Sequence, residues 1–218
     1  MKKLLFDVDG TILDSMQTWV NLQNEVLNKY NISMNSIPEE EKGKIEALPY
    51  KEMCKYLAEN YVDMSYDEVV SYFENIIDDA YSNKLQAKEG AILILNELNK
   101  EGFSMAITSS TNYYLLESSL KRLGIFDLFD FIATPDTTCF KKSDSEYWHY
   151  VIDKFETEPK NCILFDDALY AIKSAKNIGI STVGIKDFPW NKKEWEHIEK
   201  ESDFTLNLIS EINIAKLK

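Results

Sequence analysis

The spacing of apolar residues changes near residue 86, and this change divides the chain into two kinds of pattern. Between Met16 and about Lys84, apolar residues recur every three or four positions, which is typical of amphipathic helices and not of strands. The stripes predict three helices, which run from Trp19 to Leu27, from Met53 to Tyr61 and from Val69 to Tyr81. Ser65 and Glu68 have the spacing of a capping box and indicate where the third helix begins. We expect residues 15–85 to form a small all-helical domain.

Outside this stretch, short apolar runs alternate with helical patterns. Buried strands are predicted at residues 4–6, 103–107, 131–133, 162–165 and 182–185, with a weaker edge strand at 202–206. Helices are predicted between them at residues 91–101, 113–123, 144–155 and 171–178. Strands that alternate with helices in this way favour right-handed crossovers and a parallel sheet covered on both faces. We therefore predict an α/β fold, in which residues 1–14 and 86–218 form a Rossmann-like core and the helical domain is inserted after the first strand.

Polar side chains follow several of these strands at the point where each strand ends. Asp7 and Asp9 follow the first strand, Thr108 the second, and Asp166 and Asp167 the strand that ends at Phe165. Because the carboxyl ends of parallel strands meet at one edge of the sheet, we expect a site there. An acidic turn alone explains an Asp-Gly pair, but it does not explain acids and a hydroxyl at three strand ends.

The residue types at this edge indicate a particular chemistry. Asp7, Asp9, Asp166 and Asp167 form a hard, oxygen-rich set, which suits Mg²⁺ and not zinc. With a metal holding a phosphoryl group, one carboxylate can attack phosphorus while its neighbour protonates the leaving oxygen and later activates water. His149 and His197 lie outside any metal-ligand spacing, so we interpret both as structural or surface residues.

Composition narrows the class of partner. The chain has 218 residues and a net charge of −13, which disfavours nucleic-acid binding. The same charge makes an anionic substrate unfavourable unless a metal ion or a local cation offsets the field. Three scattered cysteines without a CxxC pair, only three apolar residues before Asp7 and no apolar run of membrane-spanning length predict a cytoplasmic protein without a membrane partner. We expect a monomer.

Four features in order resemble the haloacid dehalogenase-like superfamily of phosphatases over nearly the whole chain. They are DVDGT at Asp7–Thr11, a strand ending in TSS at Thr108–Ser110, a lysine before a helix, and FDDALYAIKSAKNIGI at Phe165–Ile180. The helical insertion resembles the C1-type cap of the β-phosphoglucomutase-like subgroup. The resemblance implies Mg²⁺-dependent hydrolysis of small phosphorylated metabolites through an aspartyl-phosphate.

Carried onto this sequence, the resemblance implies a role for each matching residue. Asp7 would be the nucleophile and a metal ligand, and Asp9 the general acid/base with its backbone carbonyl on the metal. Asp167 would bind Mg²⁺, and Asp166 would bind it directly or support a ligand. The phosphate-binding residues would be Gly10, Thr11, Thr108 through its hydroxyl and Ser109 through its backbone amide.

The family also has a lysine that neutralises both the phosphate and the nucleophile, and two residues of this sequence could match it. The family pattern K-P-x-P-x-x-Y aligns best with residues 142–148, where both prolines and the tyrosine are replaced. This alignment favours Lys142 as the catalytic and phosphate-binding lysine, and Lys141 is the alternative.

Several other functions are possible for a chain with these residues. A dehalogenase of the superfamily does not rely on the second acid and the metal acids, whereas a β-phosphoglucomutase-like mutase would place a cap histidine where this chain has Trp19. A phosphonatase would need a cap lysine, for which Lys51 or Lys55 could serve. A receiver-type signalling domain has its acids in another order and lacks the insertion, and a phosphate-binding protein without turnover would keep the fold alone. Sugar phosphates, nucleoside monophosphates and phosphoglycolate all remain candidate substrates.

Overall fold

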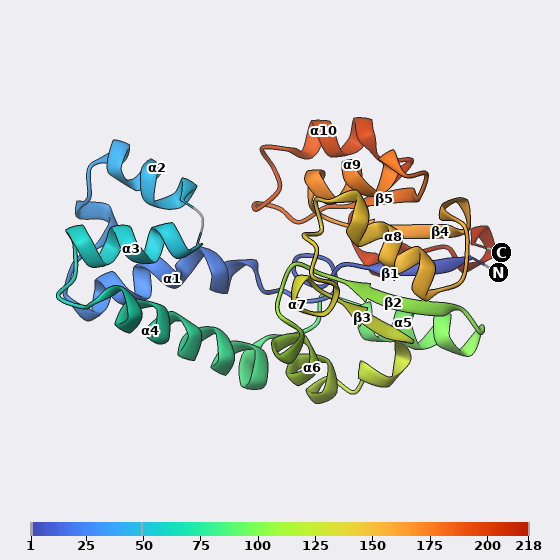
Figure 1. Ribbon diagram of the computed structural model, residues 1–218, viewed down its shortest axis with the longest axis horizontal. Coiled ribbons are helices and arrows are strands. Elements are labelled where there is room, and N and C mark those ends of the chain that lie inside the picture. The colour runs from blue at the N-terminus through green and yellow to red at the C-terminus, as the bar shows by residue number, and fades with distance from the viewer. Residues whose placement is uncertain (1, 49, 218) are drawn as a thin grey trace. The chain divides into compact units, whose positions relative to one another are not determined.

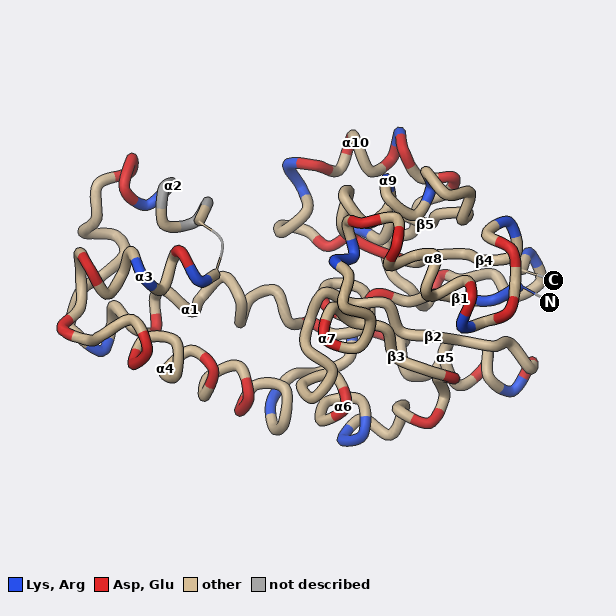
Figure 2. Tube along the Cα trace, viewed as in Figure 1, with Lys and Arg blue, Asp and Glu red and all other residues tan. Residues whose placement is uncertain are grey.

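The computed structural model describes residues 2–48 and 50–217, apart from the side chains of residues 43, 44, 46 and 47. The chain divides into two compact units (Figure 1). The first, which we call the sheet unit, consists of Met1–Ser15 and Leu85–Lys218, and the second, the helical unit, of Met16–Lys84. Figure 2 shows acidic residues along both units, so the excess of negative charge belongs to neither alone.

The sheet unit contains a six-stranded sheet in which every neighbouring pair is parallel. Its strands are β1 (Lys3–Phe6), β2 (Ser104–Thr108), β3 (Phe131–Ala133), β4 (Cys162–Asp166), β5 (Ser181–Ile185) and β6 (Phe204–Leu206), in the spatial order β3-β2-β1-β4-β5-β6. The central strand β1 is buried and apolar, as expected for a strand with a neighbour on each side. The weak edge strand predicted at residues 202–206 is present as β6, which is shorter than predicted.

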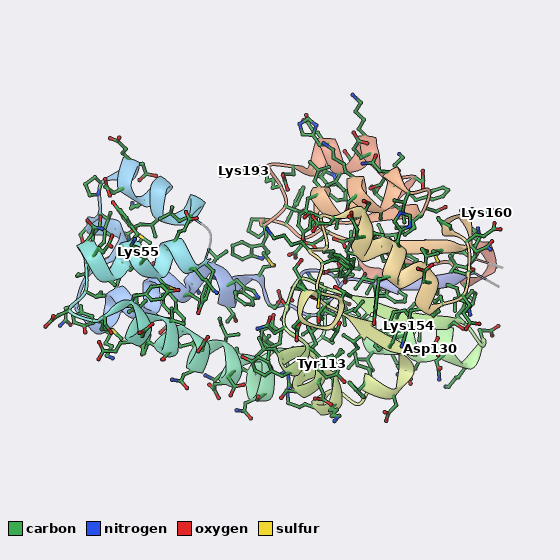
Figure 3. The ribbon with its side chains drawn as sticks, viewed as in Figure 1. Lys55, Tyr113, Asp130, Lys154, Lys160 and Lys193 are labelled. Atoms are coloured by element: carbon green, nitrogen blue, oxygen red, sulfur yellow. The ribbon has the colours of Figure 1, made fainter. Side chains whose placement is uncertain are left out.

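Helices connect these strands, and the longer ones begin and end near the predicted positions. They are α5 (Ala91–Lys100), α6 (Tyr113–Arg122), α7 (Pro135–Thr138), α8 (Ser145–Lys154), α9 (Leu169–Asn177) and α10 (Trp195–Glu201), with 3₁₀ turns η3 (Phe126–Leu128), η4 (Pro159–Asn161), η5 (Ile209–Glu211) and η6 (Ile214–Lys216). The pattern did not predict α7 and α10, because each is short and α10 buries only Ile198. The α7 residue Asp136 accepts a hydrogen bond from the amide of Tyr113. Tyr113 begins α6 and is labelled in Figure 3.

Aromatic and aliphatic side chains of α8 and α9 form a core with the inner strands. Tyr147 and Trp148 of α8 and Ala171 and Ala175 of α9 cluster with Leu5 on β1 and its neighbours. The small residues of α9 let that helix lie close to the sheet, while the large rings of α8 fill the remaining space. This packing fixes the two helices whose amino-terminal ends follow the candidate lysine and the Asp166-Asp167 pair.

The helical unit contains α1 (Met16–Lys29), the 3₁₀ turn η1 (Met34–Ser36), α2 (Glu39–Ala47), α3 (Tyr50–Asn60), α4 (Tyr66–Asp79) and the π-helical turn η2 (Ala80–Lys84). The three predicted stripes supply the buried faces of α1, α3 and α4, whereas α2 has no apolar stripe and was not predicted. The capping box is confirmed, since the Ser65 amide donates to Glu68 Oε2 at 2.7 Å and the Glu68 amide to Ser65 Oγ at 3.3 Å. Within the described residues, no helix is both long and apolar enough to cross a membrane.

We predict that Leu5→Ala lowers the free energy of unfolding by about 3 kcal/mol, because it leaves a cavity in the central strand. Leu5 is fully buried, and its neighbours across the sheet are Ala106 and Leu164. Urea unfolding followed by circular dichroism measures the change. The matched control is Leu93→Ala on α5, where leucine is 72% exposed and the expected change is within about 0.5 kcal/mol. Equal effects of the two substitutions would contradict the assignment of β1 as the core strand.

Candidate active site

The register of the sheet brings three polar residues to the same level. Phe6 on β1 pairs with Ile107 on β2 and with Phe165 on β4. The next residue along each strand is Asp7, Thr108 or Asp166. The amide of Asp7 continues the ladder by donating to the carbonyl of Phe165 at 2.9 Å. The predicted convergence at the carboxyl ends of β1, β2 and β4 is therefore found.

A buried lysine lies between two of the acids. The Lys142 ammonium is 2.6 Å from Asp7 Oδ1 and 2.6 Å from Asp166 Oδ2, and Lys142 is only 2% exposed. Burial lowers the pKa of Lys142, but the charges of Asp166 and Asp7 raise it by more. The pKa therefore lies above its usual value, and the group is positive. Lys141, the alternative left open by the sequence, is exposed.

Side chains of α8 and α9 hold the backbone of this lysine. The indole Nε1 of Trp148 donates to Ser174 Oγ at 2.8 Å, and that hydroxyl donates to the carbonyl of Lys142 at 3.1 Å. Trp148 stands where the family pattern has tyrosine, so the departure from that pattern is accompanied by a specific contact to the lysine loop.

Three buried carboxylates lie close enough together to hold a metal ion. One oxygen each of Asp7, Asp166 and Asp167 lies within 4.8 Å of the others, and Asp7 Oδ2 is buried without a hydrogen-bond partner among the described residues. Burial raises the pKa of Asp7 well above its usual range, Lys142 lowers it, and Asp166 and Asp9 raise it again. Burial and the charges of Asp7, Asp166 and Asp187 likewise raise the pKa of Asp167. An oxygen-only donor set whose repulsion is only partly relieved by Lys142 fits Mg²⁺.

The Asp9 carboxylate lies outside that group and is oriented by hydroxyl groups. Asp9 Oδ1 accepts a hydrogen bond from Ser15 Oγ at 2.5 Å, and Asp9 Oδ2 accepts one from Thr111 Oγ1 at 2.7 Å. Sequence reasoning missed both hydroxyls as parts of the site. Thr111 directly follows the TSS stretch, and its position beside a predicted strand end was the available signal.

The predicted phosphate-binding residues fall into two sets. The hydroxyls of Thr11 and Thr108 are buried and have no hydrogen-bond partner in the described part of the chain, so both can receive a ligand. The amide of Ser109, predicted to bind phosphate, instead donates to the carbonyl of Ala133 at 3.1 Å, and the amide of Gly10 donates to Leu13 at 3.0 Å.

Gly10 has a steric role in this structure. Its φ is +88°, and a Cβ atom at this position would lie 2.5 Å from Asp167 Oδ2. Only a residue without a side chain allows Asp167 to approach the turn so closely.

Residues outside the predicted set also reach this edge of the sheet. Asp187, two residues after β5, is 3% exposed and pairs with Lys88. The Tyr170 hydroxyl forms a 2.8 Å hydrogen bond with Ser110 Oγ. His149 and His197 are exposed, as expected for surface residues, and all three cysteines are free thiols.

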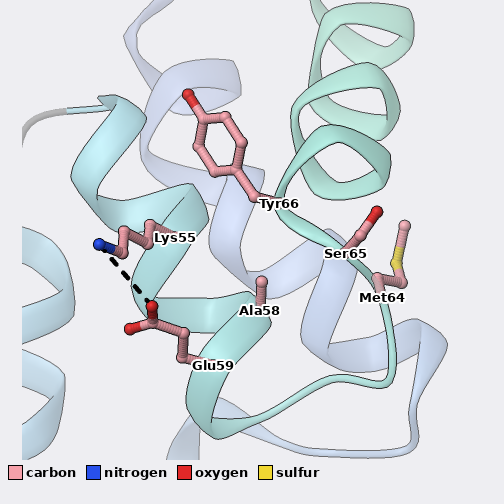
Figure 4. Close-up of a pocket in the computed structure, with 6 residues that line it drawn as sticks. All are labelled: Lys55, Ala58, Glu59, Met64, Ser65 and Tyr66. Carbon is pink, nitrogen blue, oxygen red and sulfur yellow. Dashed lines mark ion pairs between the residues drawn. The ribbon is translucent and has the colours of Figure 1, made fainter.

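The helical unit has a shallow hollow beside the start of α4 (Figure 4). It is lined by Lys55, Ala58, Glu59, Met64, Ser65 and Tyr66. Lys55, one of the two lysines considered for a phosphonatase, pairs there with Glu59 at 3.8 Å between Nζ and Oε1, and both side chains are more than half exposed. A surface ion pair along α3 therefore accounts for this lysine.

The comparisons with known proteins identify the family to which the chain belongs. The sequence model of the haloacid dehalogenase-like hydrolases matches residues 4–185, which include every site residue predicted from the sequence. The chain belongs to the haloacid dehalogenase-like hydrolase family. Pyrophosphatase PpaX of Bacillus velezensis is 23% identical to it over 211 residues, which are 96% of this chain and 93% of that protein.

Solved structures of this family share the fold. A Thermotoga maritima protein, provisionally assigned as a beta-phosphoglucomutase, has a TM-score of 0.80 at 20% identity and covers 94% of each chain. YfnB of Bacillus subtilis, provisionally assigned as a HAD hydrolase and solved with bound magnesium, has a TM-score of 0.73 at 19% identity over 96% of each chain. The predicted α/β fold is confirmed.

We predict that Asp167→Asn stabilises the metal-free protein at pH 8. Because the folded-state pKa of Asp167 is raised above the unfolded value near 3.8, its contribution to stability is complete below that value and is lost as pH rises through the folded pKa. In EDTA the variant should exceed the parent protein by about 1–4 kcal/mol at pH 8, and the difference should shrink toward pH 4. Urea unfolding at each pH measures this.

Asp130→Asn provides the control, because that acid is exposed and precedes β3 (Figure 3). It should not change the dependence on pH. An Asp167→Asn variant that is less stable than the parent at pH 8 in EDTA would show that repulsion among the buried acids is already relieved without a metal.

Proposed function

We propose that this hydrolase is a Mg²⁺-dependent phosphomonoesterase that cleaves small phosphorylated metabolites through an aspartyl-phosphate at Asp7. The observation that carries the proposal is the environment of this carboxylate. One oxygen is held by Lys142 at 2.6 Å, while the other is buried beside two more acids and has no hydrogen-bond partner among the described residues. Such an oxygen is available to a metal ion, and the carboxylate is fixed in position for attack.

The residues would divide the reaction into two transfers. Asp7 attacks phosphorus, and the bond to the leaving oxygen breaks while Asp9 donates a proton to that oxygen. Asp9 then takes a proton from water, which attacks the aspartyl-phosphate, releases inorganic phosphate and restores Asp7. Lys142 holds Asp7 in place and balances the charge of the phosphoryl group, and the free hydroxyl of Thr108 is available to one of its oxygens.

The proposed cofactor has a defined set of ligands. Mg²⁺ would be held by Asp7, Asp167 and the backbone carbonyl of Asp9, with Asp166 in direct contact or supporting them. When bound, it would neutralise phosphoryl oxygens and keep the phosphorus in line with the attacking carboxylate. Thr11 belongs to the proposed phosphate-binding segment, and Gly10 acts through the space it leaves for Asp167. The Ser109 amide, which the resemblance assigned to phosphate, is used by the carbonyl of Ala133 and is left out of the proposed set.

The helical unit is proposed as a cap that selects the leaving group. The helical unit, Met16–Lys84, interrupts the sheet unit a few residues after the Asp9 turn. An insertion at this point of the chain is proposed to control access to the strand ends. The similarity to pyrophosphatase PpaX adds pyrophosphate to sugar phosphates, nucleoside monophosphates and phosphoglycolate as candidate substrates.

A sugar phosphomutase is the second candidate, and the similarity to the Thermotoga maritima protein favours testing it. Such a mutase would use an acid/base from the cap. At the corresponding position Trp19 donates its indole N–H to the Tyr81 hydroxyl at 3.0 Å, and an indole supplies no base. Trp19 therefore favours transfer of the phosphoryl group to water over its transfer back to the sugar.

We predict that EDTA abolishes hydrolysis of p-nitrophenyl phosphate and that Mg²⁺ restores it. Asp7→Asn should lower kcat/KM more than about 1,000-fold, because asparagine does not form the acyl phosphate. Release of p-nitrophenol measures both effects. Activity that survives both treatments would exclude the proposed mechanism.

Two adjacent lysines supply the control for this assay. Lys142→Met should lower kcat/KM about 100-fold or more, whereas Lys141→Met should leave it unchanged, because only Lys142 contacts the acids. Circular dichroism confirms that both variants are folded. A loss confined to Lys141→Met would assign the phosphate lysine to the other register.

We predict that, with β-glucose 1-phosphate as the substrate, glucose 6-phosphate does not form faster than inorganic phosphate is released. The reason is the missing cap base at Trp19. The same assay, run with sugar phosphates, nucleoside monophosphates, phosphoglycolate and pyrophosphate, should show phosphate release from at least one of them. Efficient formation of glucose 6-phosphate would make the mutase the better assignment.

A further inference from the structure

One more buried acid lies beside the proposed metal ligands, at the end of β5. Asp187 comes two residues after this strand and is 3% exposed. Its Oδ1 accepts a hydrogen bond from Lys88 Nζ, which belongs to the segment where the chain re-enters the sheet unit. Its Oδ2 is buried and has no hydrogen-bond partner among the described residues.

The unpartnered oxygen lies near Asp167 Oδ2 beside Gly10. A Cβ atom built on Gly10 would lie 2.8 Å from Asp187 Oδ2 and 2.5 Å from Asp167 Oδ2. Both oxygens therefore approach one point next to the Gly10 backbone, close enough for a single water molecule to bridge them. Two buried carboxylates in this arrangement repel each other, and a cation relieves the repulsion.

The neighbouring backbone fixes the position of this acid. Asn191 Nδ2 donates to the carbonyl of Asp167 at 3.0 Å, and Asn191 Oδ1 accepts from the amide of Asp187 at 3.0 Å. On the other side, the amide of Lys88 donates to the carbonyl of Ile12 at 2.7 Å. The side-chain amide of Asn191 thus joins the Asp167 loop to the Asp187 loop, and Asp187 is held in place from two directions.

A purely structural pair would need less than this. An ion pair that only braced Lys88 against β5 would need Asp187 Oδ1 alone. It would not explain why Asp187 Oδ2 is also buried, without a partner among the described residues, beside Asp167. Burying that oxygen costs free energy unless a ligand contacts it.

We propose that Asp187 is a positioning residue of the metal site, whose Oδ2 accepts a hydrogen bond from water bound to the cation held by Asp7 and Asp167. The inference rests on the proposed Mg²⁺-dependent function. It assigns to the acid after β5 a part in cation affinity, separate from the attack and proton transfer assigned to Asp7 and Asp9.

The test measures cation binding directly. Full-length protein freed of metal is titrated with Mn²⁺, and the free ion is followed by electron paramagnetic resonance, with Mg²⁺ calorimetry as a second readout. Asp187→Asn keeps the size of the side chain and an acceptor for Lys88, and it should raise the dissociation constant about tenfold. Asp14→Asn removes an exposed acid whose charge acts on Asp187, and it should change the constant less than about twofold.

A second variant separates electrostatic action from bracing. Lys88→Met removes the positive partner and keeps Asp187, so cations should bind more tightly even though the metal-free protein loses stability. A brace predicts the opposite, because loosening the loop would weaken binding in both variants. If Asp187→Asn is too unstable to titrate, the sign of the change in Lys88→Met alone decides the question.

The failure of this inference differs from the failure of the proposed function. Parent protein that binds neither ion would overturn both. Parent protein that binds Mn²⁺, with binding lost in Asp167→Asn and unchanged in Asp187→Asn, would keep the metal site and overturn the role of Asp187. Weaker binding in both Asp187→Asn and Lys88→Met would show that the pair is only a brace.

Discussion

The buried ammonium group of Lys142 lies between the carboxylates of Asp7 and Asp166, and the candidate site depends on this contact. Charges removed from water are tolerated only when they are paired, because the interior of a protein solvates them poorly. One lysine offsets one acid, whereas Asp7, Asp166 and Asp167 bring three carboxylates to the same place. The acids that Lys142 does not offset favour binding of a cation, and the proposed metal ion would supply that positive charge.

The rest of the sheet unit supports this contact in stages. Parallel register places Asp7 and Asp166 side by side, and the Trp148–Ser174 contact holds the carbonyl of Lys142. The space left by Gly10 admits Asp167. Each of these supports is made by buried, half-buried or backbone groups, so the charges are held close together without fully exposed side chains.

Much of this arrangement could be predicted from the order of residues alone. Strands ending in acid or hydroxyl residues indicate a site by a general rule of parallel sheets, and this rule found Asp7, Thr108 and Asp166. The predictions were weaker where single contacts decide the structure. The helices α2, α7 and α10 have no apolar stripe to reveal them, and pattern reasoning depends on such a stripe.

Hydrogen bonds in the loops were also beyond the reach of sequence patterns. The hydroxyl of Thr111 reaches Asp9, and the amide of Ser109 completes the sheet instead of facing the site. Asp187 escaped notice because it lies two residues beyond its strand, so its position depends on the Asn191 contacts and not on the strand register. Such contacts follow from loop geometry, which one sequence does not specify.

The most direct test of the account is to locate the phosphoryl group during turnover. The protein is mixed with Mg²⁺ and an excess of a phosphomonoester that it hydrolyses, and the reaction is quenched in acid within milliseconds. The protein is then digested and examined by mass spectrometry, with borohydride used to trap the acyl phosphate. The account predicts phosphorylation on the peptide that contains Asp7 and trapping at Asp7 itself, with neither in EDTA. Rapid turnover without a phosphorylated intermediate, or with the phosphoryl group on another residue, would contradict it.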